Sequence, residues 1–322
     1  MARLVRVNPE RDPGYRRIRS GAGFRYLDAD GAAAPGEVRQ RIAALVIPPA
    51  WTDVWIASDP MAHVQAIGTD AAGRRQYMYH PRWRQRRDRD KFVRALALAA
   101  ALPRARGQVT TALGREGFDR ARAQAVAFRL LDEAAPRVGS SRYLARYGSR
   151  GLTTLRRRDA SITGSVIALS FPAKSGKRAH LEIDDGALAA VMAELKAGRP
   201  AAALLWHRVG RRQITLTAAD VNRSIHELTG GPFTAKDFRT LRGTIIAAET
   251  LARVGAGDTL RERTRAERLA VDAAAAALGN TPAIARGSYI DPRVFDRYAR
   301  GAVLDLTVSR ERAIRRLLEP GG

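Results

Sequence analysis

The sequence predicts an α+β protein in which a small N-terminal antiparallel sheet precedes a larger, mainly helical region with one short three-stranded sheet. Two observations support this prediction. Up to about residue 88, short alternating segments are separated by turn residues, which is typical of strands. Beyond that point, apolar residues recur at helical spacing, and one β-rich island interrupts them. The length of 322 residues fits two domains, which we expect at 1–90 and 91–322.

The N-terminal region is expected to hold four short strands and a helix. Asp30-Gly31 supplies a turn after the first strand. Residues 35–45 have helical spacing and stop before Pro48-Pro49, because proline disfavours helical geometry in the residue before it. The charged run 82–91 is expected to be the linker or boundary between the domains. The predicted strands cover 23–27, 54–57, 64–67 and 76–79.

The C-terminal region is expected to be a set of helices around the β-rich island. Thr217 and Thr234 are suitable N-cap residues. The island comprises strands at 151–155, 165–171 and 178–183, and a tight polar turn at 172–177 places Lys174 at the tip of a hairpin. The predicted helices cover 91–102, 119–135, 186–197, 217–229, 235–254, 258–278 and about 309–318.

The charge balance points to a polyanionic partner. Lys and Arg total 56 against 32 Asp and Glu, for a formal net charge of +24, which favours a nucleic-acid backbone. A membrane surface is disfavoured, because the basic residues are spread along the chain and no long apolar run accompanies them. No segment fits a signal peptide, so we expect a soluble, cytoplasmic protein. The absence of cysteine excludes disulfides, thiol nucleophiles and thiolate metal sites.

Several chemical motifs are missing or weak. The five histidines show no metal-ligand spacing, and Gly176-Lys177 lacks the remainder of a P-loop, so we expect no cofactor and no nucleotide triphosphate. Glu182, Asp184 and Asp185 follow a predicted strand and fit a turn. A metal-dependent nuclease would need acidic residues that converge from several segments.

Tyr289 is the strongest candidate for a nucleophile. It lies in a polar, turn-rich segment, 278–292, downstream of Arg137, Lys174 and the pair Lys236-x-x-Arg239. A phenol is a poor nucleophile at neutral pH, so its attack on a phosphate needs cations that stabilise the charge on the phosphoryl oxygens.

Each of these cations also has a simpler explanation, because a single Arg or Lys in so basic a chain is most often a solvated surface charge. Lys236 and Arg239 lie three apart near a helix N-terminus and would attract phosphate, although Asp237 between them could neutralise them instead. The segment 73–84 places Tyr77 and Tyr79 on one face of a strand among arginines. That face suits DNA contacts, but the tyrosines could equally pack on the domain core.

Taken in order, these residues resemble the type IB DNA topoisomerases, and most closely the poxvirus-like enzymes of bacteria such as Deinococcus. The likeness covers nearly the whole chain. Lys236-x-x-Arg239 is discriminating, because the related tyrosine recombinases usually carry His-x-x-Arg at that place. The other matching segments are IPPAW at 47–51, QYMY at 76–79, GLTTLR at 151–156, which matches a strand of the family, and SYIDP at 288–292.

The resemblance implies that the two domains clamp duplex DNA and that Tyr289 forms a 3′-phosphotyrosyl link without ATP or an obligatory metal. Arg137, Arg239 and Asn280 would hold the non-bridging oxygens, and Lys174 would act as general acid. Asn280 stands where most of the family has histidine, and its amide donates without a charge. A monomer is expected. The implied DNA-contacting residues are Gln76, Tyr77, Tyr79, Ser140, Tyr143 and Lys236.

Two other functions compete with this interpretation. A site-specific tyrosine recombinase would share the fold, but the Lys-x-x-Arg box and the absence of an evident protomer-exchange tail count against it. A non-catalytic basic DNA-binding protein would account for the charge alone. It leaves the ordered set of Arg137, Lys174, Lys236-x-x-Arg239 and Tyr289 unexplained.

Overall fold

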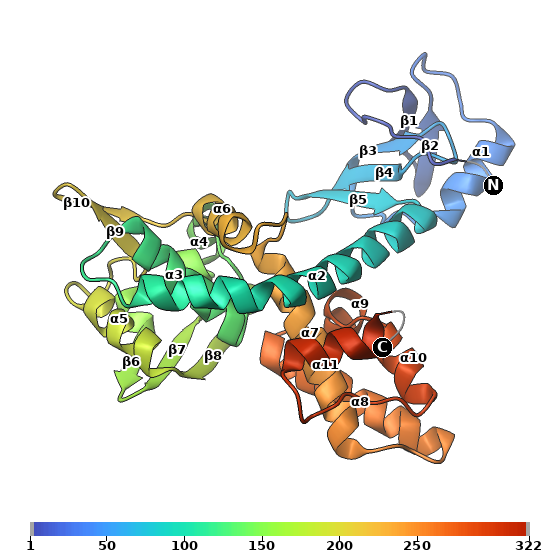
Figure 1. Ribbon diagram of the computed structural model, residues 1–322. Helices are drawn as coiled ribbons and strands as arrows, with labels where there is room; N and C mark the ends of the chain where they lie inside the picture. Colours follow the sequence, from blue (N-terminus) through green and yellow to red (C-terminus); the bar gives the residue numbers. More distant parts are fainter. Residues whose placement is uncertain (1–2, 320–322) are drawn as a thin grey trace. The chain divides into compact units, whose positions relative to one another are not determined.

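The computed structural model describes residues 3–319, without the side chain of Ser175. The chain divides into two compact units, Met1–Asp90 and Lys91–Gly322. The first unit contains an antiparallel five-stranded sheet and one helix, and the second contains most of the helices and a three-stranded sheet (Figure 1). The α+β class predicted from the sequence is therefore confirmed.

The sheet of the first unit has the strand order β2-β1-β3-β4-β5, and its pairs are antiparallel. Ile42 of the helix packs with Val54, Ile56 and Ala66 of the sheet to form a small core. The first strand was not predicted, because its arginines obscure the alternation. The elements are β1 (Gly14–Ser20), β2 (Gly23–Leu27), α1 (Gly36–Ala44), β3 (Thr52–Ala57), β4 (Val64–Thr69) and β5 (Arg75–Tyr79).

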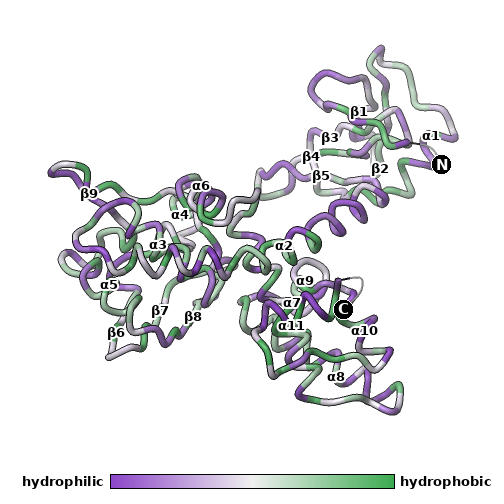
Figure 2. Tube along the Cα trace, in the orientation of Figure 1, coloured by the Kyte–Doolittle hydropathy of each residue, from purple (hydrophilic) through white to green (hydrophobic). Residues whose placement is uncertain are grey.

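Residues 82–91 are helical and belong to α2 (Pro81–Leu113), so this segment is not an irregular linker, but the boundary between the two compact units does fall within it, between Asp90 and Lys91. Pro81 is compatible with the first position of a helix, and the arginines that follow are good helix formers. The first turns of α2 are strongly hydrophilic, and its apolar stretch lies further along, at 95–102 (Figure 2). The charge of this segment was therefore a sign of exposure, not of irregular structure.

The second unit begins with two long helices and a small sheet. Strands β6, β7 and β8 form the antiparallel three-stranded sheet, and β9 and β10 pair separately. The elements in chain order are α3 (Arg120–Ala134), α4 (Ser141–Tyr147), β6 (Ala160–Thr163), β7 (Val166–Pro172), β8 (Arg178–Asp184), α5 (Gly186–Lys196), β9 (Trp206–Val209) and β10 (Arg212–Thr215).

The strand predicted at 151–155 was wrong. Residues Leu152–Thr154 form a 3₁₀ turn, η1, and the third strand of the sheet is β6 instead. The N–H groups of Leu152 and Thr153 donate to the carbonyls of Arg137 and Val138, at 2.8 and 2.9 Å. This turn therefore fixes the segment that carries Arg137, through bonds that a local sequence pattern does not reveal.

The remaining helices pack around α7. Its neighbours include α3, α8, α9, α10 and α11. Thr234 precedes α7, and the Asp237 carboxylate accepts the Thr234 N–H at 2.8 Å, so the predicted cap position is confirmed; Thr217 caps α6 in the same way. The helices are α6 (Ala218–Thr229), α7 (Ala235–Val254), α8 (Leu260–Leu278), α9 (Pro282–Tyr289), α10 (Arg293–Ala299) and α11 (Arg310–Leu318).

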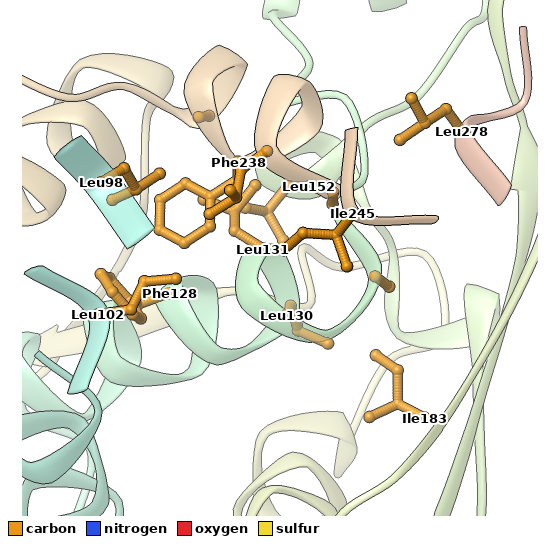
Figure 3. Packing of buried hydrophobic residues seen from close by; sticks show 14 of the residues in the cluster. Leu98, Leu102, Phe128, Leu130, Leu131, Leu152, Ile183, Phe238, Ile245 and Leu278 are labelled. Atoms are coloured by element: carbon orange, nitrogen blue, oxygen red, sulfur yellow. The ribbon is translucent and has the colours of Figure 1, made fainter. Parts of the chain in front are cut away.

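The main core of the second unit anchors α7 against α2 and α3. The Phe128 and Phe238 rings meet edge to face, with centroids 5.2 Å apart. Leu98 and Leu102 of α2 and Leu131 of α3 lie beside them (Figure 3). Because Phe238 lies between Lys236 and Arg239 in the sequence, this packing fixes the turn of α7 that carries both cations.

Candidate active site

Arg239 is held by the ends of two helices. It is only 5% exposed. Its Nη1 donates to the carbonyl of Ala135 at 2.6 Å, and its Nη2 donates to the carbonyl of Leu278 at 2.8 Å. The Ala135 carbonyl lies at the C-terminus of α3, and the Leu278 carbonyl lies at the C-terminus of α8. The last carbonyls of a helix have no partner within the helix and carry partial negative charge. The guanidinium is therefore stabilised, and no carboxylate within residues 3–319 pairs with it.

Arg137 follows α3 and lies half-buried close to Arg239. Its Nη2 donates to the carbonyl of Gly279 at 3.3 Å and to Oδ1 of Asn280. Burial lowers the pKa of Arg137, and the charge of Arg239 lowers it further. Among the described side chains, neither arginine forms an ion pair with a carboxylate. The two side chains therefore create an uncompensated positive site that suits an anion.

Asn280 is fixed by the junction of two helices. Helix α8 ends at Gly279, whose φ of +58° is readily adopted only by glycine, and the Asn280 N–H donates to Ala275 at 2.9 Å. Thr281 then caps α9, and Pro282 opens it. With Oδ1 bonded to Arg137, the amide Nδ2 is buried and has no partner among the described residues. It is an unpaired donor whose exposed area in this structure is close to zero.

Tyr289 is the last residue of α9, so the turn-rich segment predicted around it is largely helical. The Cζ atom of Arg239 lies 5.0 Å from the centroid of the tyrosine ring. Burial raises the pKa of the Tyr289 phenol, but a hydrogen bond and the charge from Arg239, with the charges of Arg137 and Lys236, outweigh it. The net pKa lies below its ordinary value. The site thus favours the phenolate.

Lys174 lies exposed in a 3₁₀ turn, η3 (Lys174–Gly176), between β7 and β8. The predicted hairpin tip is therefore confirmed. A cavity of about 280 Å³ is lined by Lys174, Arg137 and Arg239 together. His180 lines the same cavity, whereas His207 is buried on β9. The fold therefore brings together three cations that are widely separated in the sequence.

Lys236 lies exposed in the first turn of α7 and contributes to the charge around Tyr289. The neighbouring Asp237 does not neutralise it. Asp237 is 1% exposed, accepts from Arg94 Nε at 2.8 Å and also accepts from Thr234. The alternative in which Asp237 pairs with Lys236 or Arg239 is therefore wrong.

The sequence of the chain is similar to known DNA topoisomerases over most of its length. Residues 80–300 match the family model of the eukaryotic DNA topoisomerase I catalytic core, and residues 23–70 match the N-terminal domain of bacterial DNA topoisomerase IB. The chain belongs to the type IB DNA topoisomerases. It is 29% identical over 288 residues to a DNA topoisomerase 1B of Acanthamoeba polyphaga mimivirus, covering 86% of this chain and 85% of that protein.

The family assignment confirms the resemblance drawn from the sequence, including its bacterial branch. This topoisomerase is an isomerase, and its substrate is DNA. The family comparison does not assign individual residues. The roles of Tyr289 and its neighbours therefore depend on the geometry described above.

Two aromatic surfaces of the topoisomerase include predicted DNA contacts. Tyr143 on α4 is 52% exposed and lies 5.7 Å from Tyr147 between ring centroids. The hydroxyl of Ser140 caps this helix by accepting the Tyr143 N–H at 3.3 Å. The Ser140 side chain therefore has a structural role in addition to the predicted DNA contact.

The second aromatic surface is on β5. Tyr77 and Tyr79 are exposed, and their rings stack with centroids 6.0 Å apart, so the alternative of core packing is wrong. Strand alternation places Gln76 and Met78 on the opposite face. The Gln76 Nε2 donates to Asp70 at 2.8 Å, so its amide is already engaged.

Glu182 and Asp184 lie within β8, and Asp185 follows it with structural partners. Asp185 caps α5 by accepting the Leu188 N–H at 2.9 Å, and it pairs with Arg129. Within residues 3–319, no group of three or more His, Asp or Glu side chains is arranged to hold a metal ion. None of the described helices is both long and apolar enough to cross a membrane.

The sequence did not indicate which residues pack against the backbone of Tyr289. Gly243 and Thr244 of α7 contact the backbone of Tyr289, and Asp291 is buried beside them. An isolated glycine within a helical pattern was the available signal, because glycine weakens helices and often marks a close approach of the backbone.

Proposed function

We propose that this topoisomerase relaxes supercoiled duplex DNA by transient cleavage of one strand, with Tyr289 as the nucleophile. The phenol oxygen attacks the scissile phosphorus and forms a 3′-phosphotyrosyl bond, and the 5′-oxygen of the next nucleotide leaves. One phosphodiester replaces another, so the bond energy is retained. After strand rotation, the free 5′-hydroxyl attacks the phosphotyrosine and restores the DNA without ATP.

The main support for this proposal is the pair of arginines Arg137 and Arg239. Arg239 lies beside the Tyr289 ring, and the charge of Arg137 also acts on the phenol. Both guanidinium groups are held by helix-terminal carbonyls, so their charge remains available to the non-bridging oxygens of the phosphate. In the transition state these oxygens gain negative charge, which fixed cations in a buried site stabilise strongly. The unpaired Nδ2 of Asn280 supplies a further, neutral donor.

Lys174 is proposed as the general acid. The departing 5′-oxygen needs a proton, and an ammonium group that lines the same cavity as Arg137 and Arg239 can supply it. In the reverse reaction the neutral amine takes the proton from the 5′-hydroxyl. Because these protein cations carry out the charge stabilisation and proton transfer, a divalent metal is not required.

The two parts of the chain are proposed to have different roles, DNA binding and catalysis. Residues 1–90 would grip duplex DNA through Tyr77 and Tyr79, with Gln76 as a further contact. Residues 91–322 would carry out the chemistry and hold the backbone through Lys236, Tyr143 and Ser140. Since all proposed catalytic groups belong to one chain, we expect a monomer that acts on nucleoid DNA in the cytoplasm.

Relaxation of supercoiled plasmid, with EDTA present and ATP absent, tests this function. The wild type should relax the plasmid, and Tyr289→Phe should bind DNA normally but leave it supercoiled. Relaxation by Tyr289→Phe would refute the role of Tyr289, and loss of wild-type activity in EDTA would refute the metal-free mechanism. If the wild type binds DNA without relaxing it, a recombinase or an architectural protein becomes the better interpretation.

A further inference from the structure

Helix α7 carries a small surface directly behind Tyr289. A Cβ atom placed on Gly243 would lie 2.7 Å from the carbonyl oxygen of Tyr289 and 3.1 Å from its Cβ. It would also lie 3.0 Å from Cδ1 of Leu278. The shortest of these contacts is to backbone, which cannot rotate away as a side chain can. Any residue larger than glycine must therefore displace α9 or α7.

The same position is linked to Arg239. Gly243 lies four residues after Arg239, so the two occupy the same face of α7 one turn apart. The carbonyl of Leu278, the residue that a Cβ on Gly243 would press against, accepts the bond from Arg239 Nη2 at 2.8 Å. Displacement at Gly243 would therefore change the position of Tyr289 relative to the guanidinium that stabilises it.

Thr244 bonds to the same segment. Its buried hydroxyl oxygen accepts the N–H of Asp291 at 3.1 Å. Its single proton lies within reach of two carbonyl oxygens, that of Thr240 at 2.8 Å and that of Tyr289 at 3.2 Å. The bond from Asp291 is independent of which carbonyl receives the proton. Thr244 therefore fixes the backbone directly after the nucleophile.

We propose that Gly243 and Thr244 form a positioning platform that sets the distance of Tyr289 from Arg239 and the scissile phosphate. The inference rests on the proposed role of Tyr289 as nucleophile. Both platform residues are buried, so they would act through the backbone around Tyr289 and not through direct contact with the substrate. Glycine is intrinsically unfavourable within a helix, and the close approach of the Tyr289 backbone explains why position 243 has no side chain.

The test compares Gly243→Ala with Gly287→Ala. A Cβ on Gly287, which lies in α9 itself, meets nothing within 4 Å, so this variant is a matched control. Single-turnover cleavage of a duplex oligonucleotide should slow by at least about tenfold in Gly243→Ala, because displacements approaching 1 Å can cost about 100-fold. The Kd for DNA should stay within about twofold of the wild type, and Gly287→Ala should cleave normally.

The pH dependence of cleavage separates a positioning role from general destabilisation. Arg239 lowers the pKa of the phenol, so moving Tyr289 away from it should shift the rising limb of the cleavage profile to higher pH in Gly243→Ala. A merely destabilised enzyme would keep the wild-type profile with a lower active fraction.

A second pair of variants covers the case in which Gly243→Ala fails to fold. Thr244→Val keeps the shape but loses the acceptor for the Asp291 N–H, whereas Thr244→Ser retains it. Slow cleavage in Thr244→Val with near-normal cleavage in Thr244→Ser supports the platform. Equal cleavage by these two variants, or by Gly243→Ala and Gly287→Ala, overturns it. Failure of the wild type and Gly287→Ala to cleave would instead count against the proposed function.

Discussion

Replacing Asn280 by aspartate tests whether the active site depends on uncompensated positive charge. The substitution preserves the shape of the side chain and its Oδ1 contact with Arg137, but it exchanges the unpaired Nδ2 donor for a carboxylate oxygen. Beside Arg137 the new carboxyl group would remain ionised, because a neighbouring cation favours the charged form. The variant therefore neutralises Arg137 and directs negative charge at the phosphate.

The expected loss can be divided into two parts. Removing the whole amide, as in Asn280→Ala, eliminates the Oδ1 acceptor of Arg137 and forfeits the Nδ2 hydrogen bond to a charged oxygen, which is worth about 1.5–3 kcal/mol and slows cleavage by roughly 10- to 150-fold. In Asn280→Asp, a like charge about 4 Å from the phosphate adds up to ~4 kcal/mol at an effective dielectric constant of about 20. We therefore expect Asn280→Asp to cleave about 100-fold more slowly than Asn280→Ala.

Single-turnover cleavage of a duplex oligonucleotide, with covalent complex as the product, measures both rates. Thermal melting and anisotropy titration of DNA serve as controls for folding and binding. The Thr281 cap and the Gly279 turn do not involve the Asn280 side chain, so both variants should fold. If Asn280→Asp cleaves as fast as Asn280→Ala or faster, the reasoning about uncompensated charge is refuted.

Two further predictions concern stability and DNA binding. Burial raises the pKa of Glu311, but the hydrogen bond and charge of Arg106 outweigh it and leave the net pKa below 4.5. The ionised Glu311 carboxylate therefore stabilises the fold above pH 4.5, and this stabilisation is lost as the pH falls through the lowered pKa. The Tm of the wild type should exceed that of Glu311→Gln by roughly 2–4 °C at pH 7, and the difference should vanish towards pH 3. A constant difference across that range would contradict this. Tyr79→Ala should raise the Kd for duplex DNA roughly three- to tenfold through lost aromatic contact, whereas Met78→Leu on the inward face should not; equal Kd values for the two variants would exclude Tyr79 from the interface.

The sequence predicted the elements whose signals are local. The cap at Thr234 and the hairpin around Lys174 follow from residues close to one another in the chain, so both predictions were confirmed. The boundary between the two units does fall within 82–91, but the segment is not an irregular linker, and 151–155 is not a strand; the reasons are opposite. In the first, helix propensity prevailed over a charged composition, and in the second, bonds to Arg137 and Val138 took the backbone groups that a strand would have used.

Residue type and spacing are enough to predict the α+β class, the strong positive charge and the order of Arg137, Lys174, Lys236-x-x-Arg239 and Tyr289. They do not show how Arg137 and Arg239 keep their charge, because the guanidinium groups bond to backbone carbonyls at the ends of α3 and α8. Every residue has a carbonyl, so no sequence pattern marks the few that the fold leaves unpaired beside a guanidinium.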